Sequence, residues 1–114
     1  VMHELRIAED LTQIVLETAR DSGLTEVTEV NIVFGKMVQI VPEIFDFAFR
    51  ECARGTVAQN ARVNIEIRSV SMRCRVCGND FEVQENRFKC NCGSSDLEII
   101  SGKELFIKSI EGEQ

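Results

Sequence analysis

The 114-residue sequence is short of basic residues and of long apolar runs. It has 13 lysines and arginines against 19 aspartates and glutamates, a formal net charge of -6 and a pI of about 4.8. This balance argues against binding to nucleic acid, whose phosphates need a basic surface, and against an anionic membrane surface. No apolar run is long enough to span a bilayer, and no secretory signal is visible. These absences predict a cytoplasmic protein with no nucleic-acid or membrane partner.

The sequence also lacks the motifs of common catalytic sites. We find no Ser/His/Asp set, no phosphate-binding glycine loop and no paired-carboxylate motif, and the chain has only one histidine. We therefore predict that the protein is not an enzyme. A zinc-dependent hydrolase or redox enzyme is the least favoured interpretation, since it needs an open metal position or a reactive cysteine pair.

Hydrophobic periodicity predicts two helices and three strands. Apolar residues at spacings of three and four indicate an amphipathic helix over residues 3–22. A second helix starts at Pro42, because proline is favoured at the first helical position, and ends near Gly55. Alternating apolar residues indicate strands over residues 27–34, 63–67 and 104–110. The predicted fold is α+β, with two helices packed on a three-stranded sheet.

Between residues 72 and 97 the composition changes. Apolar residues become sparse, and four of the five cysteines lie here. A stretch this short cannot bury an apolar core large enough to fold by itself, so it needs a further stabilising link such as a bound metal. We predict a small metal-folded domain, residues 72–98, inserted into a discontinuous domain of residues 1–71 plus 99–114. The fifth cysteine, Cys52, lies in the apolar stripe of the second helix and is predicted to be a packing thiol.

The clustered cysteines have the spacing of a closed metal site. Cys74 and Cys77 form a CxxC pair followed by Gly78, and Cys90 and Cys92 form a CxC pair. Four thiolates provide a tetrahedral structural zinc site. Iron suits the same all-sulfur shell. A disulfide or free buried thiols are the less favoured alternatives, because cysteines clustered in this way in a reducing compartment usually bind a metal. The CxC pair is one residue shorter than usual, which predicts distortion or a labile ligand there.

His3 lies close to the start of the sequence. An amine, deprotonated backbone amides and an imidazole together form a planar nitrogen cage that suits Ni(II) or Cu(II). If Val1 is the first residue, this cage is formed by Val1, Met2 and His3. If Met2 is the first residue, it is formed by Met2, His3 and Glu4. The Glu4 carboxylate fits two roles, a nickel ligand or a helix-start acid favoured by the dipole. From these residues alone, a solvated helix-start histidine is the favoured interpretation.

Several short segments spread over the chain stand out together. They are Met2-His3-Glu4-Leu5, Ile7-Ala8, Val33-Phe34-Gly35-Lys36, Val41-Pro42-Glu43, Phe47-Ala48-Phe49, Gly55-Thr56-Val57-Ala58, the paired cysteines and Cys92-Gly93-Ser94. In combination they resemble the HypA family, the nickel metallochaperones of NiFe-hydrogenase maturation. The resemblance covers essentially the whole chain. Val1 and the short Cys90–Cys92 pair depart from the family pattern.

The resemblance implies a nickel carrier with structural zinc. His3 would be the nickel imidazole, with Met2 and Glu4 giving backbone nitrogens. The zinc ligands would be Cys74, Cys77, Cys90 and Cys92. A monomer or homodimer would deliver nickel to the hydrogenase large subunit with a companion GTPase, and some relatives also serve urease. The alternative is a zinc-ribbon protein-interaction module without a nickel role.

Overall fold

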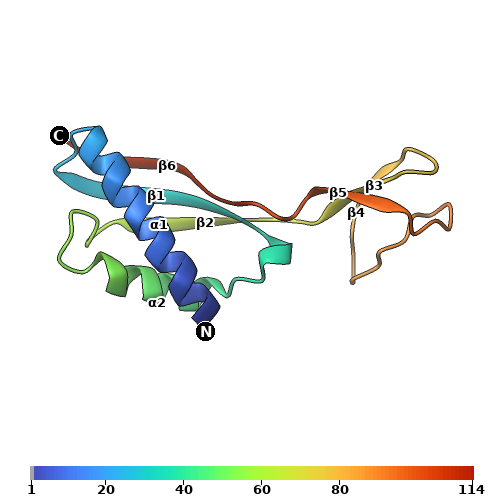
Figure 1. Ribbon diagram of the computed structural model, residues 1–114, viewed down its shortest axis with the longest axis horizontal. Helices are drawn as coiled ribbons and strands as arrows, with labels where there is room; N and C mark the ends of the chain where they lie inside the picture. The colour runs from blue at the N-terminus through green and yellow to red at the C-terminus, as the bar shows by residue number, and fades with distance from the viewer. Residues whose placement is uncertain (1) are drawn as a thin grey trace. The chain divides into compact units, whose positions relative to one another are not determined.

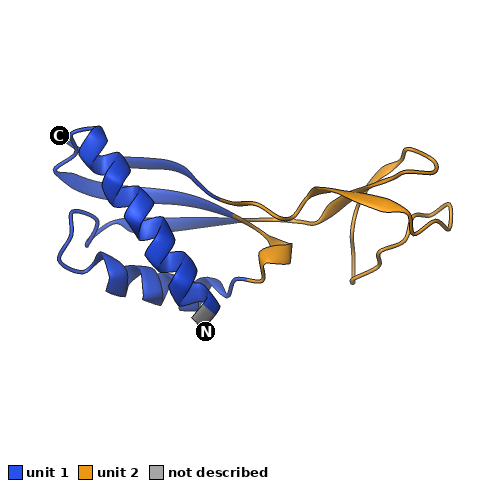
Figure 2. Ribbon diagram, viewed as in Figure 1, with its two compact units in different colours: residues 1–33, 40–66, 106–114 blue, residues 34–39, 67–105 orange. Residues whose placement is uncertain are grey.

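The computed structural model describes residues 2–114. The chain forms two compact units (Figure 2): unit 1 comprises residues 1–33, 40–66 and 106–114, and unit 2 comprises residues 34–39 and 67–105. The division predicted from the sequence, residues 1–71 plus 99–114 against residues 72–98, stays a prediction. Unit 2 is wider than the predicted insertion, because residues 34–39, 67–71 and 99–105 also belong to it.

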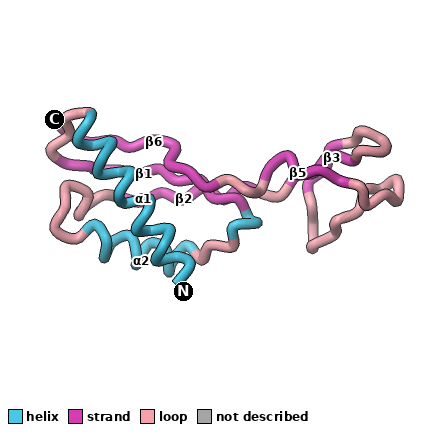
Figure 3. Tube along the Cα trace, viewed as in Figure 1, coloured by secondary structure: helices cyan, strands magenta, loops and turns pink. Residues whose placement is uncertain are grey.

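Unit 1 is built on two helices and a three-stranded sheet (Figures 1 and 3). Helices α1 (Met2–Asp21) and α2 (Pro42–Ala53) contact each other. The sheet has the order β2-β1-β6, formed by β1 (Glu26–Gly35), β2 (Arg62–Arg68) and β6 (Leu105–Glu113). Thr25 hydrogen-bonds to Glu113 and Thr28 to Glu111, so β1 and β6 run antiparallel. The predicted α+β architecture is confirmed.

The core of unit 1 lies between the helices and one face of the sheet. Val15 and Ala19 of α1, Val30 and Ile32 of β1, and Phe45 and Phe49 of α2 are all fully buried. Burying a side chain such as phenylalanine contributes about 1.5–3 kcal/mol. Phe47, on the other side of α2, is 67% exposed and lies outside this core.

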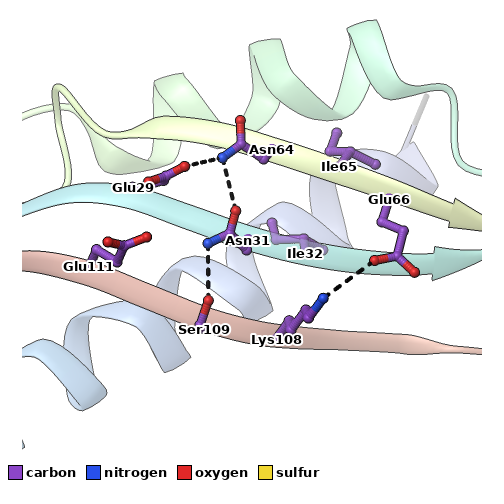
Figure 4. Close-up of a pocket in the computed structure, with 9 residues that line it drawn as sticks. All are labelled: Glu29, Asn31, Ile32, Asn64, Ile65, Glu66, Lys108, Ser109 and Glu111. Atoms are coloured by element: carbon purple, nitrogen blue, oxygen red, sulfur yellow. Dashed lines mark hydrogen bonds and ion pairs between the residues drawn. The ribbon is translucent and has the colours of Figure 1, made fainter.

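The opposite face of the sheet is polar (Figure 4). The Asn64 amide donates hydrogen bonds to Glu29 and to Asn31 (2.9 Å), and the Asn31 amide donates to Ser109 (3.0 Å). These side chains line a shallow hollow of about 480 Å³. These polar side chains lie on the face of the sheet that does not contribute to the core.

Unit 2 contains a second sheet that the sequence did not predict. Its order is β4-β3-β5, with β3 (Ser71–Cys74), β4 (Asp80–Glu82) and β5 (Leu97–Ser101) all antiparallel. Arg73, at the centre of β3, is opposite Asp80 on one side and Glu98 on the other. Its guanidinium lies 2.8 Å from the Asp80 carboxylate and 3.8 Å from that of Glu98. Opposite charges on neighbouring strands help to fix this register.

Two glycines pack backbone against backbone in unit 2. The Gly35 N–H donates to the Glu104 carbonyl (2.8 Å), and the Met37 N–H donates to the Gly102 carbonyl (2.9 Å), at the start of a 3₁₀ turn, η1 (Lys36–Val38). A Cβ atom on Gly35 would lie 2.1 Å from the backbone of Gly102. Only glycine at position 35 permits this approach.

We predict that Gly35→Ala destabilises the protein by about 1–3 kcal/mol, the usual cost of overpacking, because the added methyl group meets rigid backbone. Urea denaturation followed by circular dichroism measures the change. Gly55→Ala is the control: Gly55 has a positive φ of 79° but nothing within 4 Å of its Cβ position. A smaller effect at position 35 than at position 55 would contradict the steric explanation.

Candidate metal sites

The four clustered cysteines converge on one point in unit 2. Their sulfur atoms all lie within 4.8 Å of one another, and all five cysteines of the chain are free of disulfides. The Cys74 and Cys92 sulfurs are 3.7 Å apart, and those of Cys77 and Cys90 are 3.5 Å apart. A tetrahedron with zinc–sulfur bonds of about 2.3 Å has edges of roughly 3.8 Å. The donor set and its spacing therefore fit a closed tetrahedral zinc site.

The first cysteine pair lies in a tight turn after β3. The Gly78 N–H donates to the Cys74 carbonyl (2.9 Å), and the Cys77 N–H points at the Cys74 sulfur (3.5 Å). Gly78 has a φ of 76°, which glycine adopts without strain. The turn directs both sulfurs to the same point and gives a thiolate at Cys74 a backbone donor.

The CxC pair also closes into a turn. The Gly93 N–H donates to the Cys90 carbonyl (2.9 Å), and the Cys90 N–H donates to the Ser94 carbonyl (2.9 Å). Gly93 takes a φ of 94° at the end of this turn. The shorter pair therefore reaches the cluster. Each pair supplies one buried residue, Cys74 or Cys90, and one exposed residue, Cys77 or Cys92.

The thiols of the cluster differ in acidity. The backbone N–H of Cys77 is the main cause that lowers the pKa of Cys74 to about 6. The backbone N–H of Cys92 favours a Cys90 thiolate, but burial and hydrogen bonds shared with the other cysteines outweigh it and raise the pKa of Cys90 to about 12. Crowded thiolates repel one another, so they ionise together only around a cation. Metal binding to such a set releases protons.

The N-terminal residues lie in unit 1, at the start of α1. Val1 lies outside the described residues, so its predicted part in a nickel cage stays a prediction. His3 is exposed in the first turn of the helix. Glu4, in the same turn, is buried, with 4% of its surface exposed.

Glu4 is buried because its carboxylate has a partner far away in the sequence. It accepts a hydrogen bond from the backbone N–H of Val41 (3.0 Å), in the segment that leads into α2. This bond is the main cause that holds the pKa of Glu4 below its ordinary value. The carboxylate thus fastens the first turn of α1 to the start of α2, and sequence reasoning missed this because the two residues are 37 positions apart.

The fifth cysteine, Cys52, lies in unit 1. Cys52 is half-buried in α2 and is not one of the clustered cysteines, and burial raises the pKa of its thiol. Among residues 2–114, neither helix combines the length and the apolar character that crossing a bilayer requires.

Fold and site together define a small α+β metal-binding protein. A family model described as "Hydrogenase/urease nickel incorporation, metallochaperone, hypA" matches residues 2–112. The chain is 34% identical over 111 residues to the hydrogenase maturation factor HypA of Aquifex aeolicus, covering 96% of both proteins. It is 39% identical over 114 residues to that of Nostoc punctiforme, covering 99% of this chain and 97% of the relative. The chain belongs to the HypA family.

Solved structures share the fold. The solution structure of the nickel metallochaperone HypA from Helicobacter pylori has a TM-score of 0.70 at 21% identity, covering 96% of this chain and 97% of that one. A second HypA solution structure has a TM-score of 0.74 at 23% identity, with 98% and 97% covered. The predicted family is confirmed.

For the cysteine cluster we predict that Cys74→Ser abolishes zinc retention and unfolds residues 72–98 while unit 1 stays folded. Structural zinc supplies about 10–16 kcal/mol of apparent binding free energy, far more than the few buried side chains of this stretch. Zinc analysis and the dispersion of backbone amide NMR signals measure both effects. Cys52→Ser is the matched control and should keep its zinc. Equal loss of backbone amide signals from both units would contradict the prediction that the two units fold independently.

Proposed function

We propose that the chain binds Ni(II) through the Met2-His3-Glu4 segment and delivers it to the large subunit of a NiFe-hydrogenase. The observation that carries the proposal is the match of residues 2–112 to a nickel-incorporation family. The matched residues include His3, which is exposed at the start of α1. The protein acts as a carrier rather than an enzyme. It works in the cytoplasm with a companion GTPase, as a monomer or homodimer.

The nickel ligands are the His3 imidazole and backbone nitrogens of Met2 and Glu4. The N–H groups of a helix's first turn have no acceptor within the helix, so using their nitrogens as ligands breaks no helical hydrogen bond. The Glu4 carboxylate already accepts the Val41 N–H. This engagement favours the backbone nitrogen of Glu4, and not its carboxylate, as the ligand.

Zinc is the resident metal, held by Cys74, Cys77, Cys90 and Cys92. When bound, it contributes folding free energy to unit 2. The chain's own groups keep the site closed: Cys74 and Cys90 are buried, and the backbone N–H groups of Cys77 and Cys92 are directed at their sulfurs. A closed four-thiolate shell has no position for a substrate.

The nickel site is tested with His3→Ala. We expect wild-type protein to retain nickel after desalting and the variant to lose it, because an imidazole that completes the cage cannot be replaced by a methyl group. Elemental analysis of nickel and zinc in the same sample measures both metals. Nickel affinity should fall as the pH falls, since every nitrogen ligand must lose its proton.

Gln13→Ala, an exposed change on the same helix, is the control and should keep both metals. Nickel retained by His3→Ala would exclude His3 as a ligand. Unchanged zinc with no nickel in either protein would support the alternative, a zinc-ribbon interaction module without a nickel role.

Glu4→Gln separates the carboxylate from the backbone nitrogen. We expect the variant to keep nickel and to lose thermal stability at neutral pH, because Val41 loses a charged acceptor. The folded pKa of Glu4 lies below its ordinary value of 4.5, so its contribution is full above that value and is lost as the pH falls through the folded pKa. The difference in Tm between the two proteins should therefore vanish in acid. Loss of nickel in Glu4→Gln would make the carboxylate a ligand.

A further inference from the structure

Strand β2 forms one edge of the unit 1 sheet (Figure 1). In the order β2-β1-β6 it is paired with β1 on one side, and among residues 2–114 no strand of this sheet pairs with its other side. Such an edge presents backbone N–H and C=O groups that are ready to pair with a further strand. The outer side of β2 is therefore a surface on which a partner strand can be added.

A shallow hollow opens beside this edge, between β2 and α2. Its volume is about 310 Å³, and it is lined by Pro42, Glu43, Asp46, Val63 and Ile65. Val63 and Ile65 are half-buried, although they alternate along β2 in the manner of core residues. Helix α2 therefore leaves the apolar side chains at this edge partly uncovered.

An exposed phenylalanine lies on the helix that borders the hollow. Phe47 comes four positions after Glu43, so the two side chains are neighbours on one face of α2. Phe47 is 67% exposed and is the most exposed phenylalanine among residues 2–114. An exposed aromatic side chain next to a half-buried apolar pair and an unpaired strand edge indicates a surface that another protein covers.

The charges along β2 make the strand complementary to a second copy of itself. When two copies pair antiparallel about a two-fold axis, residues opposite each other lie on the same face of the joined sheet. A register centred on Asn64 places Arg62 opposite Glu66 in both directions. A register centred on Ile65 places Arg62 opposite Arg68, and one centred on Glu66 places that residue opposite its own copy. Like charges opposite each other are destabilising, so the charges favour the register centred on Asn64.

Both charged side chains are accessible for this contact. Arg62 is exposed and has no ion-pair partner in the part of the chain that the structure describes. The Glu66 carboxylate lies 3.7 Å from the Lys108 ammonium, and both side chains are exposed, so water screens that pair. Glu66 can therefore accept an arginine from a second copy at little cost.

We propose that β2 is a dimerisation edge, which pairs antiparallel with β2 of a second copy in the register centred on Asn64. Arg62 of each copy pairs with Glu66 of the other, and Val63 of each copy packs against Ile65 of the other. The two sheets join into one, and the contact covers the hollow and the exposed Phe47, which provides the apolar part of the binding. Neither the nickel segment nor the cysteines take part, so the interface does not depend on the carrier function.

The test is charge reversal in the zinc-loaded full chain, with the dimer dissociation constant measured by sedimentation equilibrium. We expect the wild-type protein to dimerise, and Arg62→Glu and Glu66→Arg each to weaken the dimer by about tenfold. Each change turns two attractive pairs of the symmetric interface into two repulsive ones. The dispersion of backbone amide NMR signals checks that both variants remain folded.

Mixing the two variants tests the register directly. Arg62→Glu has acids at both positions and Glu66→Arg has bases at both, so an equimolar mixture should regain the wild-type affinity through heterodimers. Two misfolded variants would not show this recovery. Arg87→Glu, the same charge change at an exposed position of unit 2, is the control and should leave the dimer unchanged. A wild-type protein that stays monomeric, single variants that dimerise as the wild type does, or no recovery on mixing would overturn the proposal.

Discussion

Four sulfur atoms within 4.8 Å of one another are the constraint on which unit 2 depends. As thiolates they repel, and as thiols they provide little packing, so only a shared cation makes their convergence favourable. The other parts of unit 2 hold the four sulfurs in this position. The turns at Gly78 and Gly93 bring the sulfurs together, and β3, which ends at Cys74, carries the Arg73 ion pairs to both neighbouring strands.

Unit 1 is stabilised in a different way. Its helices and sheet bury a continuous apolar core that includes Phe45 and Phe49, whose ring centres lie 6.0 Å apart. Such a core needs no metal, because the buried area offsets the loss of chain entropy. We therefore expect the two units to differ in their response to loss of metal, which destabilises unit 2 and leaves the core of unit 1 intact, whereas heat and denaturant act on both.

Sequence reasoning found the features that depend on local pattern or on residue chemistry. The helices have a clear period of 3.6 residues, and the spacing of Cys74, Cys77, Cys90 and Cys92 indicates a metal site whatever the fold around it. It missed β3, β4 and β5 because strands of three to five residues are too short to show alternation. It also missed the burial of Glu4, since the hydrogen bond to Val41 depends on a tertiary contact.

The proposed nickel site and the cysteine site have opposite designs for a physical reason. A closed shell of four thiolates exchanges its ion only after a ligand leaves, so it keeps its metal. An exposed site of one imidazole and backbone nitrogens can be opened by protonation or by a competing ligand, so it can pass its metal on. A carrier needs the second kind of site at a defined position. The Glu4–Val41 hydrogen bond provides this, because it fixes the first turn of α1 to the segment before α2 while His3 stays exposed.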